Sequence, residues 1–418
     1  MSSSPNGAAP GREARAGRFP GPSLIPALTA IQHEHGWLPR EELVKLSLAT
    51  RRPLYEIQGL ISFYPHFRTE QPRVASVRVC HDLSCWLKDA DATIASIRAR
   101  HGDDTDIELE EASCLGRCEQ APAVAVNEVP TTAAKLENLL ADARAGTLVQ
   151  ATAPAAAHRW PNDPYGEGET RYRVLRRALL GDLSASEIIA ELKEAGLRGM
   201  GGAGFPTASK WELVAAQPAT PKYVICNADE SEPGTFKDRQ ILSDEPHLVL
   251  EGLLLGMFVT GAELGWVFIR HEYGPEEAVL RAELEVLHAE GLVGNDVLGS
   301  GRRFEVEVFT SPGGYILGEE SALLECLEGH RGEPRNKPPF PGVSGLWGRP
   351  TLINNVETFA DVPIIVDRGA GWWSGQGVNG GSGWKFFAVS GDVEVPGVYC
   401  VPSGTTIGNL VATAGGVK

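Results

Sequence analysis

Hydrophobic and polar positions follow a helical spacing at the start of the chain and then change to an alternating pattern. Apolar residues three and four apart over 24–38 and 40–49 predict that the segment 21–72 is helical. From residue 73 to 145, alternating stretches are separated by amphipathic ones, which predicts a small α/β domain. Its strands are predicted at 74–82, 106–114 and 122–129, and its helices at 87–102 and 132–146.

A second series of strands and helices follows residues 146–170, an Ala- and Pro-rich stretch that is typical of a linker. Over 171–383, strand patterns alternate with helical ones, which predicts a layered α/β domain. Residues 384–418 predict two short strands and the start of a helix, as part of a further domain. Within 171–383, helices are predicted at 184–197 and 318–329, and strands at 222–230 and 304–312. The predicted fold class is α/β.

Composition narrows the functional class. The most hydrophobic stretch, 248–269, contains two Glu and several Gly, so it predicts a buried helix leading into a strand rather than a membrane span. Residues 1–20 lack the apolar centre of a signal peptide and predict a disordered tail, and we therefore expect a cytoplasmic protein. The net charge of −16 argues against nucleic acid as the main partner.

Seven cysteines in a chain without an export signal suggest metal ligands rather than disulfides. Four of them form two pairs, Cys80 with Cys85 and Cys114 with Cys118, and each pair follows a predicted strand. Loops at neighbouring strand ends bring such pairs together. Four thiolates suit either tetrahedral zinc or an iron–sulfur cluster, which the spacing favours. The alternative, four reduced thiols in a core, is not typical of two spaced pairs.

The segment 198–207 contains four glycines in ten residues, namely Gly199, Gly201, Gly202 and Gly204. Glycine lets a backbone approach a phosphate or a flat ring closely, but it also serves in ordinary tight turns. The spacing differs from the dinucleotide fingerprint of a Rossmann fold, which also requires a preceding strand. The loop by itself therefore does not decide between these uses.

Residues 20–145 resemble the thioredoxin-fold 2Fe–2S subunit of respiratory complex I. The resemblance rests on the four cysteines together with the stretches "LIPALTAIQHEHGWLP", "EIQGLISFYPHF" and "LGRCEQAPAV". It implies a thioredoxin-like ferredoxin domain preceded by helices. It also implies that the 2Fe–2S cluster is held by Cys80, Cys85, Cys114 and Cys118.

Residues 172–380 resemble the flavoprotein subunit of complex I, which binds FMN and NADH. The resemblance rests on four motifs in order, "RGMGGAGFPTASKW", "NADESEPGTFKDR", "GGYILGEESALLECLEGHRGEPRNKPPFP" and "PTLINNVET". It assigns the catalytic positions to Glu230, near the flavin ring, and Glu320, near NADH. The implied cofactor-binding residues are Gly199, Gly201, Gly202, Phe205, Lys210, Asn227, Asp229, Glu230, Glu232, Tyr315, Gly318, Glu319, Glu320, Lys337, Phe340, Asn354, Asn355 and Thr358.

The same resemblance implies roles for the side chains that face the flavin. Asn354, Asn355 and Thr358 would bind the phosphate and the ribityl chain, and Lys210 would supply a local positive charge. Met200 stands where many family members have a basic residue, so we do not expect that residue's contact with a phosphate or with the ring in this chain. Hydride transfer from nicotinamide to flavin needs no general base, so the protein's role is positioning.

The turn 227–230 would surround the flavin ring and the nicotinamide ribose. The amide of Asn227 and the carboxylates of Asp229 and Glu230 offer the donors and acceptors for this, and the carboxylate charge would tune the flavin potential. The alternative is an ordinary solvated turn. Phe205 would stack on the adenine of NADH, and the alternative for each aromatic residue is core packing.

The C-terminal part departs from the family pattern. Residues 384–418 resemble the start of a β-grasp (SLBB-like) domain, after which the family has a 4Fe–4S domain. No cysteine follows Cys400, and Cys226, Cys326 and Cys400 are too scattered to replace its ligands. We therefore expect either a truncated piece of a longer chain or an unusual short form.

Both modules lie in one chain, as in the β (diaphorase) subunit of soluble NAD-dependent formate dehydrogenase, which this sequence resembles most. That resemblance implies a separate partner subunit with the catalytic metal. The alternatives are the diaphorase subunit of an NAD-reducing hydrogenase and the flavoprotein subunit of complex I. A zinc-stapled scaffold without enzyme activity is the alternative from another class. The choice between NAD and NADP stays open.

Overall fold

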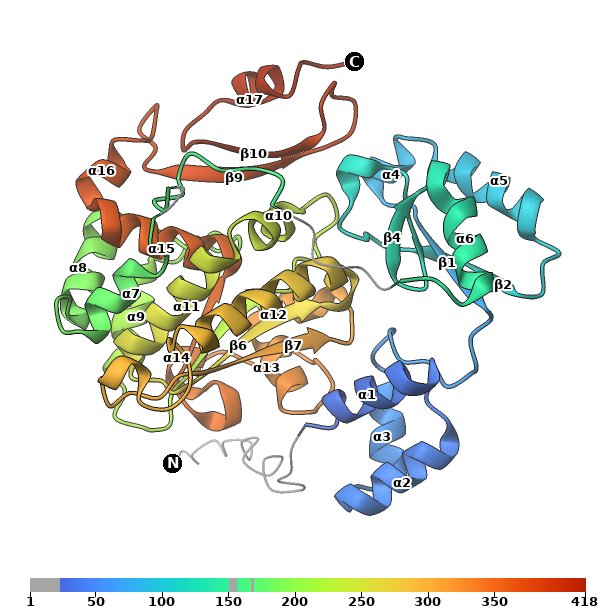
Figure 1. Cartoon of the computed structure of the whole chain (residues 1–418), viewed down its shortest axis with the longest axis horizontal. Helices are drawn as coiled ribbons and strands as arrows, with labels where there is room; N and C mark the ends of the chain where they lie inside the picture. Colours follow the sequence, from blue (N-terminus) through green and yellow to red (C-terminus); the bar gives the residue numbers. More distant parts are fainter. Residues whose placement is uncertain (1–22, 150–155, 167–168) are drawn as a thin grey trace, which may run out of the picture.

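The structure is a computed structural model of the 418-residue chain, and it describes residues 23–149, 156–166 and 169–418. The predicted tail at 1–20 and part of the predicted linker at 146–170 lie outside these residues. The described chain has an N-terminal helical segment, a small domain, a large domain and a C-terminal segment, which Figure 1 shows in blue, light blue to teal, green to red-orange, and red. Among the described helices, none is both long and apolar enough to cross a bilayer.

The N-terminal helical segment packs on the large domain. Its apolar side chains, among them Ile25, Leu28 and Leu60, share one core with Ile225 and Phe268 of the large domain. The resemblance places these helices before the ferredoxin domain in the sequence, and the structure shows that their apolar side chains pack on the sheet of the large domain. The helices are α1 (Ile25–His35), α2 (Arg40–Thr50) and α3 (Leu54–Ile61).

The small domain is a four-stranded sheet in the order β2-β1-β3-β4. β1 pairs in parallel with β2 and antiparallel with β3, and β3 pairs antiparallel with β4. The predicted strand at 122–129 is shorter, and a fourth strand follows it. The elements are β1 (Ala75–Cys80), α4 (Leu83–Trp86), α5 (Ala90–His101), β2 (Ile107–Ala112), β3 (Ala123–Val126), β4 (Val129–Thr132) and α6 (Leu136–Ala145).

The large domain is a parallel sheet covered by helices on both faces. Its strand order is β7-β6-β5-β8, with β5 (Tyr223–Ala228), β6 (Leu264–Arg270), β7 (Glu305–Ser311) and β8 (Thr351–Asn355). The helices are α7 (Arg173–Leu179), α8 (Ala185–Glu194), α9 (Thr207–Ala215), α10 (Lys237–Asp244), α11 (Pro246–Thr260), α12 (Gly274–Ala289), α13 (Glu320–Leu327), α14 (Pro341–Ser344), α15 (Val356–Arg368) and α16 (Ala370–Ser374).

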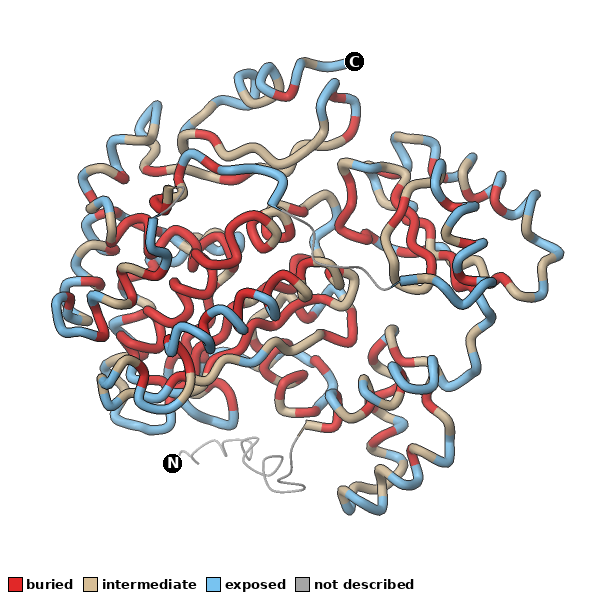
Figure 2. The backbone as a smooth tube through the Cα atoms, in the orientation of Figure 1, coloured by how far each residue is buried: buried red, intermediate tan, exposed pale blue. Residues whose placement is uncertain are grey.

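The helix α11 forms the centre of the core, and every one of its residues is buried. This is the stretch for which the sequence predicted a buried helix leading into a strand, and β6 follows it. Figure 2 shows the buried layer running through the large domain. The described part of the predicted linker is packed as well, because Trp160 and Tyr165 are buried and Trp160 Nε1 donates to Asp244 Oδ2 over 3.0 Å.

The C-terminal segment forms a hairpin and a helix above α10 and α15 (Figure 1). Its elements are β9 (Trp384–Val389), β10 (Gly397–Pro402) and α17 (Ile407–Thr413). β9 and β10 pair antiparallel. The backbone N–H of Phe386 donates to Glu357 Oε1 over 2.9 Å, so the hairpin is bonded directly to the large domain.

The close packing of α11 on α15 gives a stability prediction. A Cβ atom at Gly252 would lie 1.9 Å from the carbonyl oxygen of Phe359. We expect Gly252→Ala to lower the free energy of unfolding by about 1–3 kcal/mol or more, because the helices must separate. Urea unfolding followed by tryptophan fluorescence measures this. The control is Gly408→Ala in α17, where a Cβ meets nothing within 4 Å and stability should not fall. Equal effects of the two changes would contradict the prediction.

Candidate functional site

The parallel sheet reverses its strand order at β5, and the predicted site residues gather there. The chain runs outward from β5 to β6 and β7, then returns to β8 on the other side of β5. At such a switch point the connections leave in opposite directions and open a crevice at the carboxyl ends of the strands. Asn227 of β5 is registered with Asn355 of β8 at this edge. Asn227 does not lie on the turn expected after the strand, because β5 continues to Ala228.

The glycine loop connects α8 to α9 and closes on itself like a small hairpin. The N–H of Gly199 donates to the Phe205 carbonyl over 2.9 Å, and Arg198 forms a bridge with Pro206. Gly202 and Gly204 have φ values of 115° and 63°, and a Cβ at either position would meet nothing within 4 Å. The backbone therefore faces open space where glycine is conformationally required.

The glycine loop lies against the end of β8. The N–H of Met200 donates to Thr358 Oγ1 over 2.9 Å. A Cβ at Gly201 would come within 3.2 Å of the Asn355 Cβ. Lys210, in the helix after the loop, donates from Nζ to the Ile353 carbonyl over 2.9 Å. Burial lowers the pKa of Lys210. The first and fourth motifs, about 150 residues apart in the sequence, are thus in direct contact.

The second and third motifs also meet at this edge of the sheet. Asn227 Nδ2 donates to the Gly318 carbonyl over 2.9 Å, and Asn227 Oδ1 accepts from the N–H of Asp229 over 3.2 Å. A Cβ at Gly318 would lie 3.1 Å from the Asp229 carbonyl oxygen, so this contact requires a small residue. All four motifs therefore converge at one edge of the sheet.

The two carboxylates after β5 are buried, with 6% of each residue exposed, so the solvated-turn alternative is wrong. Glu230 accepts from the N–H groups of Asp238 and Arg239 over 3.0 and 3.2 Å and from the Tyr273 hydroxyl over 3.1 Å. Burial raises the pKa of Glu230 to about 8, and the charge of Asp238 acts in the same direction. Burial also raises the pKa of Asp229 to about 6.

Lys237 and Asp238, for which the sequence predicts no role, also belong to this site. Lys237 Nζ lies 2.6 Å from Asp238 Oδ1 and 2.7 Å from Glu357 Oε2. Asp238 Oδ2 accepts from Asn355 Nδ2 over 2.6 Å. Both residues stand in the quoted motif "NADESEPGTFKDR", which is the signal that they matter. Their pairing with α15 could not be read from spacing.

The remaining predicted residues form a more exposed rim. Lys337 Nζ lies 2.9 Å from Glu319 Oε1 and 2.6 Å from Glu320 Oε1. The Tyr315 hydroxyl donates to Glu232. The rings of Phe205, Tyr315 and Phe340 are all exposed, which argues against the core-packing alternative for these aromatic residues. An exposed ring beside a polar crevice is available for stacking on a ligand.

The residues present fit a flavin nucleotide. Asn354 Oδ1 and Asp229 Oδ2 are buried in the structure without a hydrogen-bond partner, and a polar ligand would satisfy such atoms. The open space at Gly202 and Gly204 adds room beside the backbone. Two surface concavities of about 330 and 380 Å³ lie elsewhere, on the small domain and between α12 and β7. The donor and acceptor set, not cavity size, therefore locates the site.

The four paired cysteines are buried together at one end of the small domain. Cys80 ends β1, Cys85 lies in α4, and Cys114 and Cys118 follow the parallel neighbour β2. Cys114 Sγ lies 3.4 Å from Cys118 Sγ. The N–H groups of Gly116 and Ala123 donate to Cys114 and Cys85 over 3.4 Å each.

The chemistry of this cluster fits a metal centre. Four buried thiolates repel one another, so without a cation they share protons. Hydrogen bonds from the neighbouring thiols accordingly lower the pKa of Cys114 and raise that of Cys80. A bound metal centre would let all four ionise. These observations by themselves fit both zinc and iron–sulfur.

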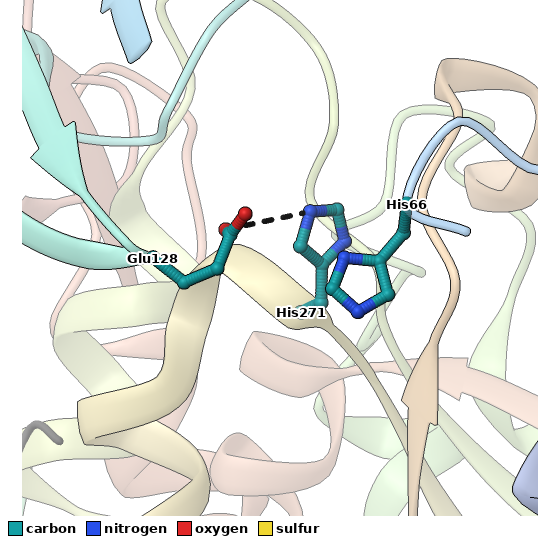
Figure 3. A group of neighbouring side chains, drawn as sticks. All are labelled: His66, Glu128 and His271. Atoms are coloured by element: carbon teal, nitrogen blue, oxygen red, sulfur yellow. Dashed lines mark ion pairs between the residues drawn. The ribbon is translucent and has the colours of Figure 1, made fainter. Parts of the chain in front are cut away.

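A second group of possible ligands lies where three parts of the chain meet. His66, Glu128 and His271 approach one another there, and Figure 3 shows the ion pair between Glu128 and His271. The two imidazoles are 4.2 Å apart between ring centroids. Arg78 Nη1 lies 3.0 Å from Glu128 Oε2 and 3.5 Å from His271 Nε2. The guanidinium of Arg78 already pairs with the carboxylate of Glu128, so we interpret the group as a contact between domains.

Comparison with known proteins agrees with both sites. Family models match residues 18–144 as a thioredoxin-like [2Fe-2S] ferredoxin, 192–364 as the Nuo51 FMN-binding domain and 386–418 as an SLBB domain. The alpha subunit of the NAD-reducing hydrogenase HoxS from Cupriavidus necator is 33% identical over 94% of this chain and 69% of its own. This chain belongs to the family of flavoprotein diaphorase subunits of complex I and NAD-reducing hydrogenases.

Other members of this diaphorase family agree with the assignment. A subunit of the NADH-quinone oxidoreductase of Rhizobium meliloti is 48% identical over 57% of each chain, so our chain spans little more than half of that relative. The crystal structure of an NAD+-reducing [NiFe]-hydrogenase in the H2-reduced state superimposes with a TM-score of 0.82. It is 31% identical, and the match covers 95% of this chain and 70% of that one.

The family matches confirm the predicted FMN and 2Fe–2S cofactors and the thioredoxin-like and SLBB folds. They also decide the question that the cysteines left open, in favour of iron–sulfur over zinc. They do not assign individual residues. The cofactor contacts of this chain therefore rest on the geometry described above.

Two glycines offer a matched test of the loop. Gly204 in the loop and Gly196 before it have φ values of 63° and 68°, and a Cβ at either meets nothing within 4 Å. Alanine at either position costs roughly 1–2 kcal/mol of backbone strain. We expect only Gly204→Ala to weaken FMN binding as well, by about tenfold or ~1.4 kcal/mol, because its Cβ would enter the ligand's space. Flavin fluorescence titration measures this, and equal affinities of the two variants would contradict the prediction.

Proposed function

We propose that this chain is an NADH/NAD+ oxidoreductase (diaphorase) module that passes electrons between NAD, FMN and a 2Fe–2S cluster. The observation that carries the proposal is the convergence of four sequence motifs at the switch point of the parallel sheet. The names of the relatives from Rhizobium meliloti and Cupriavidus necator, which contain NADH and NAD, support it. We also keep the cytoplasm as its proposed location.

The inner residues would hold the flavin. The glycine loop and the ends of β8 and α15 offer N–H, amide and hydroxyl groups for the phosphate and ribityl chain, from Gly201, Gly202, Asn354, Asn355 and Thr358. Gly199 would instead hold the loop in shape, because its N–H already donates to the Phe205 carbonyl. Asn227, Asp229 and Glu230 would face the ring, and Lys210 would bring a buried positive charge close to the crevice. When bound, FMN supplies the conversion between two-electron hydride transfer and one-electron transfer.

The rim would hold the dinucleotide. Phe205 and Phe340 are exposed rings for stacking, and Lys337 offers a cation to the phosphates when it leaves its carboxylate partners. Glu320, Glu319, Glu232 and Tyr315 would contact the ribose hydroxyls, for which carboxylates accept two hydrogen bonds. In this arrangement the chain's own residues bind and orient the substrate, and the reaction requires no proton-abstracting side chain.

We propose that this chain is the β subunit of a soluble NAD-dependent formate dehydrogenase. This assignment rests on sequence resemblance. The partner of this chain would be a subunit with the catalytic metal and further iron–sulfur clusters. The second candidate is the diaphorase subunit of an NAD-reducing hydrogenase, favoured by the match to the HoxS alpha subunit along 94% of this chain. Copurification with the neighbouring subunits decides between them, according to whether formate or hydrogen reduces the flavin.

The activity itself is tested with the chain alone. After reconstitution, we expect about two iron atoms per chain. We also expect a flavin spectrum that NADH bleaches and NADH-dependent reduction of ferricyanide. NADPH measured in parallel gives the choice of nucleotide. Protein that binds zinc, lacks iron and leaves NADH unoxidised would support the zinc-stapled scaffold instead and would contradict this function.

The raised pKa of Glu230 predicts a pH-dependent flavin potential. Below pH 8 the carboxyl is mostly protonated and neutral, so Glu230→Gln should leave the midpoint potential of bound FMN nearly unchanged. Above pH 8 the wild-type carboxylate opposes electron addition, so its midpoint should be lower than that of the variant. We expect about 30 mV at pH 9, a tenfold change for two electrons. Potentiometric titration measures it, and a constant difference from pH 6 to 9 would contradict the assignment.

A further inference from the structure

The cysteine cluster does not lie at a free end of the small domain but is pressed against the large domain. Cys114 and Cys118 share an apolar cluster with Phe236, packed by Ala388 and Val398 of the C-terminal hairpin. Phe236 lies in the motif "NADESEPGTFKDR", so this packing connects the proposed flavin site with the cysteine cluster.

Arg270, the last residue of β6, bonds across this contact, and all three of its guanidinium nitrogens have a partner. Its Nη2 donates to the Cys114 carbonyl over 2.7 Å, and its Nη1 donates to the Glu230 carbonyl over 2.6 Å. Its Nε donates to Glu272 Oε2 over 2.9 Å. Only 4% of the residue is exposed. One buried cation therefore bonds the backbone of a cluster ligand and the backbone of a flavin-site carboxylate.

The guanidinium is held in a single orientation. It stacks over the Tyr273 ring at 5.1 Å from the centroid, and the carboxylate of Glu272 fixes its third nitrogen. Tyr273 itself bonds Glu230 Oε2 and lies against Gly116 of the cysteine loop. A Cβ at Gly116 would come within 2.4 Å of Tyr273 Cε1, so the loop must carry glycine to approach this closely.

We propose that Arg270 is a positioning residue that sets the reduction potential of the 2Fe–2S cluster and couples the cluster to the flavin site. Reduction adds one electron to a buried group that already carries four thiolates. A cation bonded to a ligand's carbonyl stabilises that added charge, because little water is present to screen it. The proposal rests on the proposed function, in which reduced flavin is the electron donor.

The guanidinium of Arg270 also bonds the backbone of the flavin site, and this bond would couple the cluster to that site. Its bond to the Glu230 carbonyl fixes the position of that backbone relative to Cys114, so the distance for electron transfer is set by one rigid group. The alternative is that Arg270 only joins the two domains. A purely structural role would affect cluster content and stability but not the potential of clusters that are correctly assembled.

The test is a potentiometric titration of the cluster in the reconstituted full chain, followed by its EPR signal. At the wild-type midpoint, we expect Arg270→Gln to lower the ratio of reduced to oxidised cluster about tenfold, or about 59 mV for one electron. Arg270→Lys keeps the charge and should give a smaller change in the same direction. Glu272→Gln keeps Arg270 but removes its counter-charge, so it should raise the ratio.

A matched control tests whether the loss of any arginine with similar contacts would have the same effect. Arg302 also donates to a backbone carbonyl, that of Phe258, over 3.1 Å and stacks on an aromatic ring at 4.2 Å. It lies before β7, at the opposite edge of the sheet from the site. Arg302→Gln should leave the cluster ratio within about twofold of wild type.

The outcomes separate this proposal from the proposed function. A wild-type chain with no cluster signal and no NADH-reducible flavin would overturn the function. A wild-type chain with both, whose Arg270→Gln variant stays within twofold in ratio, would overturn the role of Arg270 alone. If Arg270→Gln does not hold the cluster, Arg270→Lys and Glu272→Gln decide. Shifts in opposite directions support the proposal, and shifts in the same direction overturn it.

Discussion

The reversal of strand order between β5 and β8 is the constraint on which the rest of the site depends. Because β6 and β7 lie on one side of β5 and β8 on the other, the connections at their carboxyl ends diverge, and ligands of such sheets bind at this point. Four motifs that are distant in sequence end at this edge. The glycine loop contacts Thr358 here, so backbone as well as side-chain groups meet at this edge.

An acidic protein that handles anionic cofactors must control its charge locally. The net charge is −16, yet Arg239 and Arg270 are buried and Lys237 is half-buried, each beside a carboxylate. Burying such pairs is costly unless their hydrogen bonds are nearly complete, which they are for Arg270. Positive charge is thus kept between the proposed flavin and cluster positions, in a chain whose overall charge is negative.

The contacts between domains place the cysteine cluster beside the large domain. The small domain presents its cysteine loops to the large domain, and the C-terminal hairpin covers the same place through Ala388 and Val398. The N-terminal helices share a core with the large domain and meet the small domain near His271. This packing holds the cysteine loops at a fixed position against the large domain.

The sequence by itself determined the α/β class, the buried helix at α11, the two cysteine pairs and the motifs of the flavin site, because these depend on local periodicity and on residue types. Only the tertiary structure decided which motifs touch, that Asp229 and Glu230 are buried, and that Lys237 and Asp238 join α15. Arg270 ends an ordinary strand pattern, and nothing near it in the sequence marks it. Its importance arises from carbonyl groups 40 and 156 residues away, which chain folding alone brings together.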